Sequence, residues 1–174
     1  MAHLNIVLHE PEIPANTGNI GRTCVATGTR LHLIKPLGFD ISDKAVRRAG
    51  LDYWPLVKVH VHENFAELLA AYPDAPFFYA STKAPRSYAQ AEYPRDVFLV
   101  FGRESRGLPE NLLERVYDRC IRIPMIEGAR SLNLSNSVAI VTYEALRQHG
   151  FEHLLDHGAL TGRDEEPGAW MDYL

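Results

Sequence analysis

Short apolar segments alternate with helical patterns along most of this chain, and that alternation constrains its fold more than any other feature. Val97–Phe101 is apolar throughout, as expected of a strand that is buried on both faces. Glu63–Tyr72 carries apolar residues at helical spacing, which indicates an amphipathic helix. Because strands that alternate with helices form mainly parallel sheets covered on both faces, the sequence predicts an α/β fold.

The predicted elements follow one another in a regular order. Strands are expected at residues 4–8, 31–34, 57–61, 77–80, 97–101 and 121–124. Helices are expected at residues 17–27, 44–51, 63–72 and 109–117, and from a cap at Ser135 or Asn136 to residue 149. Residues 1–151 are predicted to form a single domain, and residues 152–174 an acidic tail that is partly mobile.

Composition excludes several classes of protein. No apolar run approaches the roughly 18 residues of a membrane span, so no membrane association is expected. The two cysteines, Cys24 and Cys120, have no metal-ligand spacing, which predicts buried, reduced thiols in a cytoplasmic protein and no metal site. A net charge of −4 argues against a globally basic nucleic-acid binder. Six of the 22 acids lie in the tail, however, so the rest of the chain is nearly neutral.

Polar loops rich in small residues follow predicted strands at three places, Asn16–Arg22, Gly102–Pro109 and Ser131–Asn136. In open α/β sheets, ligands bind at such carboxyl ends of strands. The first strand is not followed by G-x-G-x-x-G, and the chain contains no P-loop, which argues against a conventional nucleotide site. The sequence therefore predicts a small-molecule pocket of another kind.

Taken together, these loops resemble the signature motifs of the SPOUT RNA methyltransferases, and most of all a minimal type that acts on tRNA. The resemblance rests on Asn16-x5-Arg22, on Phe101-Gly102-x-Glu104-x2-Gly107-Leu108-Pro109, and on Ile123-Pro124-Met125 followed by Ser131-Leu132-Asn133-Leu134-Ser135-Asn136. It is supported by the phrases at residues 5–20 and 47–53, and it covers residues 4–151.

The resemblance implies a function as well as a fold. S-adenosylmethionine is the expected methyl donor, with S-adenosylhomocysteine as product and no metal. The expected acceptor is the ribose 2′-hydroxyl of the wobble nucleotide, a cytidine or modified uridine, in leucine tRNAs. The fold is expected to contain a trefoil knot in its carboxyl-terminal half. A homodimer formed through the first and last helices is expected as well.

The resemblance also assigns candidate site residues. The catalytic candidates are Arg22, Asn16, Glu104, Ser131 and Asn133. The candidates for binding the cofactor are Ala80, Gly102, Ile123 and Ser131, the first three through backbone groups at strand ends. Arg106, Arg130 and Tyr143 are candidates for contact with RNA or with a second subunit. An arginine stays charged at any ordinary pH, so we expect Arg22 to grip a phosphate in a bidentate fork, although a base role assisted by phosphate remains open.

Each candidate also has a purely structural interpretation. Arg22 fits a surface position on a helix, and Glu104 fits a loop acid paired with a neighbouring arginine. Ser131 and Asn133 are also typical of turns and helix caps. Two further groups of titratable residues are expected to be structural. His60 and His62 are predicted to face solvent, whereas Glu10 and Glu12 are predicted to serve loop structure.

Two alternatives to wobble-nucleotide methylation follow from the same residues. The first is the same 2′-O-methyl transfer to ribosomal RNA or to another tRNA position. The second is a non-catalytic RNA-binding assembly factor that keeps the fold. The presence of Arg22, Glu104, Ser131 and Asn133 together favours an enzyme.

Overall fold

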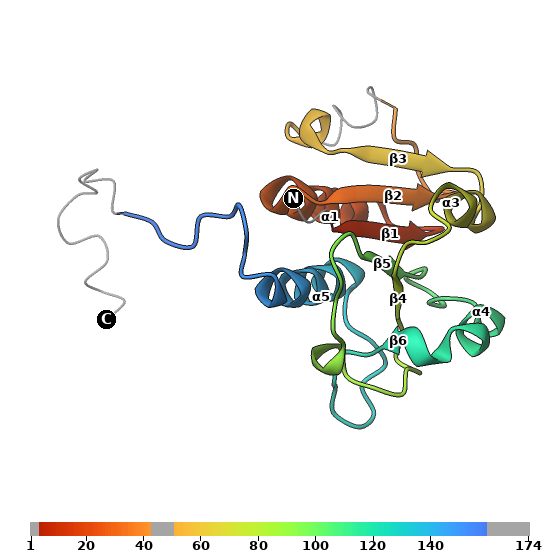
Figure 1. The fold of residues 1–174 in the computed structure, drawn as a ribbon. Helices are drawn as coiled ribbons and strands as arrows, with labels where there is room; N and C mark the ends of the chain where they lie inside the picture. The colour runs from red at the N-terminus through yellow and green to blue at the C-terminus, as the bar shows by residue number, and fades with distance from the viewer. Residues whose placement is uncertain (1–3, 43–50, 160–174) are drawn as a thin grey trace, which may run out of the picture.

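The computed structural model describes residues 4–42 and 51–159, and their strands form one parallel sheet (Figure 1). The strand order is β3-β2-β1-β5-β4-β6, and every neighbouring pair is parallel. The strands are β1 (Asn5–His9), β2 (Arg30–Ile34), β3 (Val59–His62), β4 (Phe77–Ala80), β5 (Phe98–Phe101) and β6 (Cys120–Ile121). The predicted α/β class with a mainly parallel, helix-flanked sheet is confirmed.

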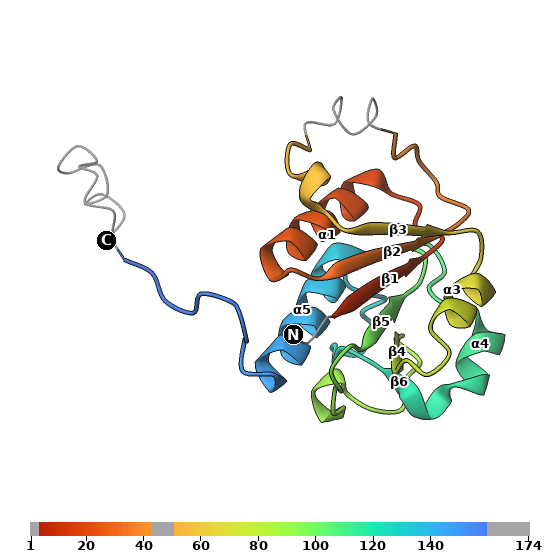
Figure 2. The same cartoon turned by 45° about the horizontal axis from the view of Figure 1, so that its top comes forward.

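Helices cover both faces of this sheet (Figure 2). The helices are α1 (Pro14–Thr27), α3 (Phe65–Ala71), α4 (Glu110–Arg115) and α5 (Leu134–Gln148), with short 3-10 turns at Trp54–Leu56, Tyr88–Gln90 and Tyr117–Arg119. Helices α1 and α5 lie side by side on one face, and α3 and α4 lie on the other (Figure 2).

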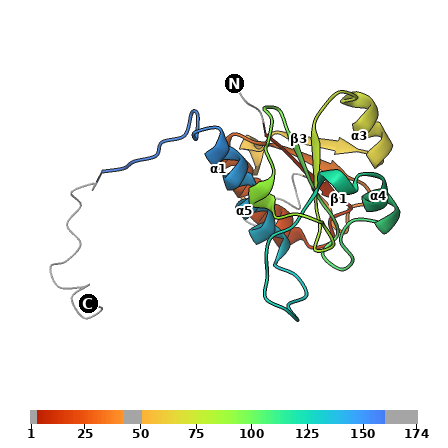
Figure 3. The same ribbon diagram turned by 60° about the horizontal axis from the view of Figure 1, so that its bottom comes forward.

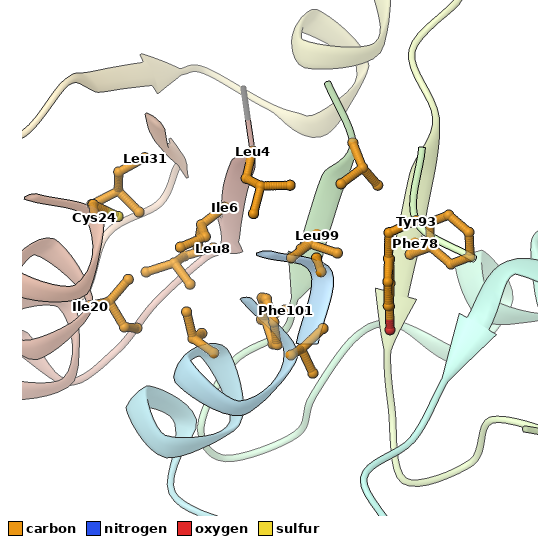
Figure 4. Packing of buried hydrophobic residues seen from close by; sticks show 14 of the residues in the cluster. Leu4, Ile6, Leu8, Ile20, Cys24, Leu31, Phe78, Tyr93, Leu99 and Phe101 are labelled. Carbon is orange, nitrogen blue, oxygen red and sulfur yellow. The ribbon is translucent and has the colours of Figure 1, made fainter. Parts of the chain in front are cut away.

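Side-chain alternation along the central strands divides the core into two layers. On β1 and the residue before it, Leu4, Ile6 and Leu8 point toward α1 and α5, where they pack with Ile20 (Figure 4). Val7, between them, belongs to the opposite layer, under α3 and α4. Because successive strand side chains point to opposite faces, an apolar strand is what a sheet covered on both sides requires.

Several element boundaries differ from the sequence prediction. Helix α1 begins at Pro14 rather than residue 17, since proline fits a first helical turn whose N–H has no partner. The last strand ends at Ile121, and its neighbour Arg122 makes only an isolated bridge to Ser87. Strand β3 starts at Val59 rather than residue 57, because Val57 caps the 3-10 turn Trp54–Leu56 and its N–H bonds to the Trp54 carbonyl.

Other predictions lie partly or wholly outside the described residues. The helix expected at residues 44–51 falls almost entirely there, as does most of the acidic tail. The described start of the tail is fixed by Arg95, which donates two hydrogen bonds, of 2.6 and 2.7 Å, to the Glu152 carboxylate. Residues 156–159 extend away from the sheet (Figure 3). The trefoil knot stays a prediction.

Within the described residues, no helix is long and apolar enough to span a membrane, and no cluster of metal-ligating side chains occurs. Both cysteines are buried and unpaired, as expected.

A buried histidine pair connects β2 and β3. His32 is fully buried, and its Nδ1 shares a 3.0 Å hydrogen bond with Nε2 of His62, while its Nε2 lies 3.3 Å from Oδ1 of Asn5. His60 is exposed and stacks on His32 with ring centroids 4.9 Å apart. The prediction that His62 faces solvent was therefore wrong: it is 8% exposed, because its ring turns toward His32 in the neighbouring strand.

From the burial of His32 in this pair, we predict that the protein loses stability in mild acid. Burial, together with the nearby His60, His62 and Arg30, lowers the pKa of His32 to about 3 from 6.5. Since the folded pKa lies below the unfolded one, the stabilising contribution is present above pH 6.5 and is lost as the pH falls. Between pH 7 and pH 5 we expect the free energy of unfolding to drop by about 2 kcal/mol through this residue.

Urea unfolding at each pH measures that drop. The pH dependence is expected to weaken by this amount in His32→Asn and to persist in His157→Gln, which alters an exposed histidine. An unchanged pH dependence in His32→Asn contradicts the assignment.

Candidate active site

The strand order reverses between β1 and β5, and a pocket opens beside the carboxyl ends of the strands at that point. The chain leaves β1 toward β2 on one side and leaves β5 toward β6 on the other, so the connections from these two neighbouring strands run in opposite directions. Ligands of open α/β sheets bind at such a switch point. The pocket there has a volume of about 630 Å³ and is lined by the ends of β4, β5 and β6 and the loops that follow them.

Most of the candidates from the sequence meet in this pocket. Its lining includes Asn16, Ala80, Gly102, Glu104, Arg106, Ile123, Arg130, Ser131 and Asn133. Arg22 and Tyr143 do not line it: Arg22 is exposed on α1, and Tyr143 is 45% exposed on α5. Ser131 lies exposed in the long loop between β6 and α5, which projects from the body (Figure 3).

The Glu104 carboxylate joins the loop after β5 to the start of α1. It accepts hydrogen bonds from the backbone N–H of Glu12 at 2.8 Å and of Ile13 at 3.2 Å, and from Nδ2 of Asn16 at 3.0 Å. Burial alone raises the pKa of Glu104, but these donors outweigh it, and the net pKa is lower than usual. Glu104 is thus a structural anchor in the pocket wall. The arginine beside it, Arg103, pairs with Glu10 instead.

Asn16 extends this network to the third motif. Its Oδ1 accepts a 3.0 Å hydrogen bond from Nδ2 of Asn133. The Asn133 Oδ1 in turn accepts from the backbone N–H of Ser135 at 2.9 Å and of Asn136 at 3.3 Å, which caps α5. The expected cap at Ser135 or Asn136 was therefore wrong: the cap lies earlier because Asn133 has a non-helical backbone (φ −55°, ψ 141°) and its side chain accepts from both of those N–H groups.

Glu12 does not line the pocket, but it binds the loop after β5 that does. Its carboxylate accepts hydrogen bonds from the Ser105 N–H at 3.0 Å and from the Ser105 Oγ at 2.8 Å. Because Glu104 accepts from the Glu12 N–H, the two loops bind each other reciprocally. The prediction that Glu12 serves loop structure agrees with this contact, but nothing in the sequence indicates a partner 93 residues away.

The loop after β5 is folded so tightly that it needs glycine at its start. A Cβ on Gly102 would lie 2.0 Å from the carbonyl carbon of Gly107 and 2.2 Å from the Leu108 nitrogen. Gly107 itself has φ of 71°, and its N–H donates a 2.8 Å hydrogen bond to the Arg103 carbonyl. Backbone groups rather than side chains therefore form this part of the wall.

We predict that replacing the Glu104 carboxylate lowers the stability of the protein. In Glu104→Gln one carboxylate oxygen becomes an NH2 group that faces N–H donors, so the free energy of unfolding should fall by about 1–3 kcal/mol. Urea unfolding measures the change, with Glu114→Gln, an exposed position on α4, as the matched control. Equal stability of the two variants contradicts the anchoring role.

Comparison with known proteins shows that the chain is similar to RNA methylases. Residues 3–143 match the model of the SpoU rRNA Methylase family. A Bacillus subtilis protein named putative tRNA (cytidine(34)-2′-O)-methyltransferase is 52% identical over 154 residues, which cover 87% of this chain and 96% of that protein.

Two solved structures share the fold. A structure concerned with 2-OH methylation of C/U34 on tRNA has a TM-score of 0.80 and 45% identity, covering 86% of this chain and 98% of that one. An AdoMet-bound rRNA methyltransferase from Sinorhizobium meliloti has a TM-score of 0.71 and 25% identity, covering 83% of this chain and 56% of that one. The chain belongs to the SpoU methylase family, whose solved members are SPOUT methyltransferases.

Proposed function

We propose that this protein transfers a methyl group from S-adenosylmethionine to the ribose 2′-hydroxyl of nucleotide 34 in tRNA. We further propose that the nucleotide is the wobble cytidine or modified uridine of leucine tRNAs and that the enzyme acts in the cytoplasm. The observation that carries the proposal is the nearly full-length match to a protein of that name, combined with the convergence of all three motif loops on one pocket.

The pocket fits S-adenosylmethionine in size and in chemistry. A volume of about 630 Å³ suits a ligand of this size. Ile123, Met125 and Leu132 line the pocket with partly exposed apolar surface for an adenine ring, and the tight turn at Gly102 presents backbone groups. We assign binding to the strand ends at Ala80, Gly102 and Ile123 and to the exposed Ser131 hydroxyl, for which no described residue is a hydrogen-bond partner.

When bound, the cofactor supplies a sulfonium methyl that is already activated, so the protein mainly has to align the acceptor oxygen. The transfer would break the methyl C–S bond and form a C–O bond, with S-adenosylhomocysteine as the neutral leaving group and the hydroxyl proton released to solvent. Lys83, Arg103, Arg106 and Arg130 line the pocket, and such side chains bind RNA phosphates. We assign the grip on the phosphate beside the reacting ribose to Arg22, which places the hydroxyl.

The position of Arg22 supports a homodimer. Arg22 lies on α1 outside the pocket of its own chain, and the neighbouring α5 exposes Ile140 and Tyr143. We propose that a second copy packs on α1 and α5, which covers these apolar side chains and brings one protomer's Arg22 toward its partner's pocket. Tyr143, which is 45% exposed on α5, then belongs to the interface.

Methyl transfer from labelled S-adenosylmethionine to total tRNA, followed by nucleoside mapping, tests the proposal. The label is expected on 2′-O-methylated nucleosides at position 34 of leucine tRNAs. Label on a base contradicts the proposed chemistry, whereas 2′-O-label on ribosomal RNA or another tRNA position contradicts the proposed substrate. RNA binding without any transfer identifies a non-catalytic factor.

The variant Arg22→Ala separates the RNA side of the site from the cofactor side. We expect turnover to fall by at least about 100-fold, the loss typical of a charge-assisted contact in the transition state, while the calorimetric Kd for S-adenosylmethionine changes less than about twofold. Arg115→Ala, an exposed arginine on α4, is the control and should keep normal turnover. Loss of cofactor binding in Arg22→Ala shows that Arg22 is misassigned.

A further inference from the structure

Among the residues that the structure describes, Arg22 contacts an aromatic ring and pairs with no acid. Its guanidinium carbon lies 4.6 Å from the centroid of the Tyr53 ring. Among the described residues, the guanidinium has no carboxylate partner and no hydrogen-bond acceptor, although it is exposed. The ring is therefore the one described group that restrains the charged end of this side chain.

Tyr53 is itself fixed to the same helix. Its hydroxyl donates a 2.7 Å hydrogen bond to the backbone carbonyl of Gly18. Arg22 follows Gly18 by four residues, which is one helical turn, so both lie on the same face of α1. The ring is thus anchored by its hydroxyl at one turn and contacts the guanidinium at the next.

Two glycines of α1 let the segment that carries Tyr53 approach this closely. A Cβ on Gly21 would lie 2.9 Å from Cζ3 of Trp54, and a Cβ on Gly18 would lie 3.3 Å from Cδ2 of Leu51. Residues 51–54 therefore pack on α1 where it has no side chains. In Figure 2 this segment runs over α1 before the chain enters β3.

Contact with the Tyr53 ring leaves the N–H donors of Arg22 available, whereas an ion pair would occupy them. A carboxylate partner occupies the N–H donors of arginine and compensates its charge, whereas an aromatic ring attracts the cation through its π face. All five N–H donors then stay available to an anion. This is the state that a bidentate grip on a phosphodiester requires.

We propose that Tyr53 is a positioning residue that holds the Arg22 guanidinium ready for the RNA phosphate beside the methylated ribose. The proposal rests on the function proposed above for Arg22. Tyr53 touches neither the cofactor pocket nor the reacting atoms. It acts by restricting the arginine side chain to one region before the RNA arrives, so that less freedom is lost in binding.

Two substitutions separate the ring from the hydroxyl. Tyr53→Leu removes the ring, and we expect the single-turnover rate of methyl transfer at saturating cofactor to fall about fivefold. Tyr53→Phe keeps the ring, which the packing of Leu51 and Trp54 on the two glycines of α1 still holds in place, so its rate should stay within twofold of wild type. In both variants the Kd for S-adenosylmethionine should be unchanged. The control Tyr117→Leu makes the same change at a half-exposed tyrosine outside α1 and should keep the normal rate.

A readout independent of turnover is the Nε–Hε resonance of Arg22 in the ¹⁵N-labelled protein, identified by its loss in Arg22→Lys. Because the guanidinium lies over the ring, we expect this proton upfield of an ordinary arginine in the wild type and in Tyr53→Phe. It should return to the ordinary position in Tyr53→Leu. If Tyr53→Leu fails to fold, the other two proteins still decide: an Arg22 proton at the ordinary position in both wild type and Tyr53→Phe overturns the contact with the ring.

Three results overturn the proposal: a Tyr53→Leu rate within twofold of wild type, a Tyr53→Phe rate as low as that of Tyr53→Leu, or an Arg22 resonance that is the same in wild type and Tyr53→Leu. Wild-type protein that transfers no methyl group overturns the proposed function instead, and the resonance alone then decides whether the ring holds the arginine.

Discussion

The hydrogen bonds of the Glu104 carboxylate are the interaction on which the rest of the site depends. This one group accepts from two backbone N–H groups before α1 and from the Asn16 side chain. Asn16 continues the connection to Asn133, which caps α5. Hydrogen bonds to a charged acceptor are stronger than neutral ones, and a buried donor left without a partner is costly. Three loops that are distant in the sequence are thereby held in one arrangement.

The parallel sheet places the Glu104 carboxylate close to its partners. All six strands are parallel, so their carboxyl ends lie at one edge, and the switch between β1 and β5 places the first two motif loops next to each other there. The tight turn at Gly102 shapes the loop that carries Glu104, whose carboxylate accepts hydrogen bonds from the residues just before α1. Because helices α1 and α5 begin at this edge, the network also orients the two helices that we propose as the dimer surface.

The fold class and the motif loops could be predicted because they depend on local patterns. The apolar run Val97–Phe101 predicts a buried strand whatever its neighbours are, and small polar residues after a strand predict a loop. The contacts of Glu104 and Glu12 could not be predicted, since their partners lie about 90 residues away in the sequence. Pro14 ends a strand as readily as it begins a helix, and the burial of His62 depends on the neighbouring strand. The contact between Tyr53 and Arg22 is likewise visible only in three dimensions.

A crystal structure of the protein with S-adenosylhomocysteine tests the central claim most directly, that the joined motif loops form the methyl-donor site. The account predicts the ligand in the pocket, against the backbone at Ala80, Gly102 and Ile123 and within hydrogen-bond distance of Ser131, with the contact between Glu104 and Asn16 intact. A ligand bound elsewhere, or one that enters only after this contact breaks, contradicts the account.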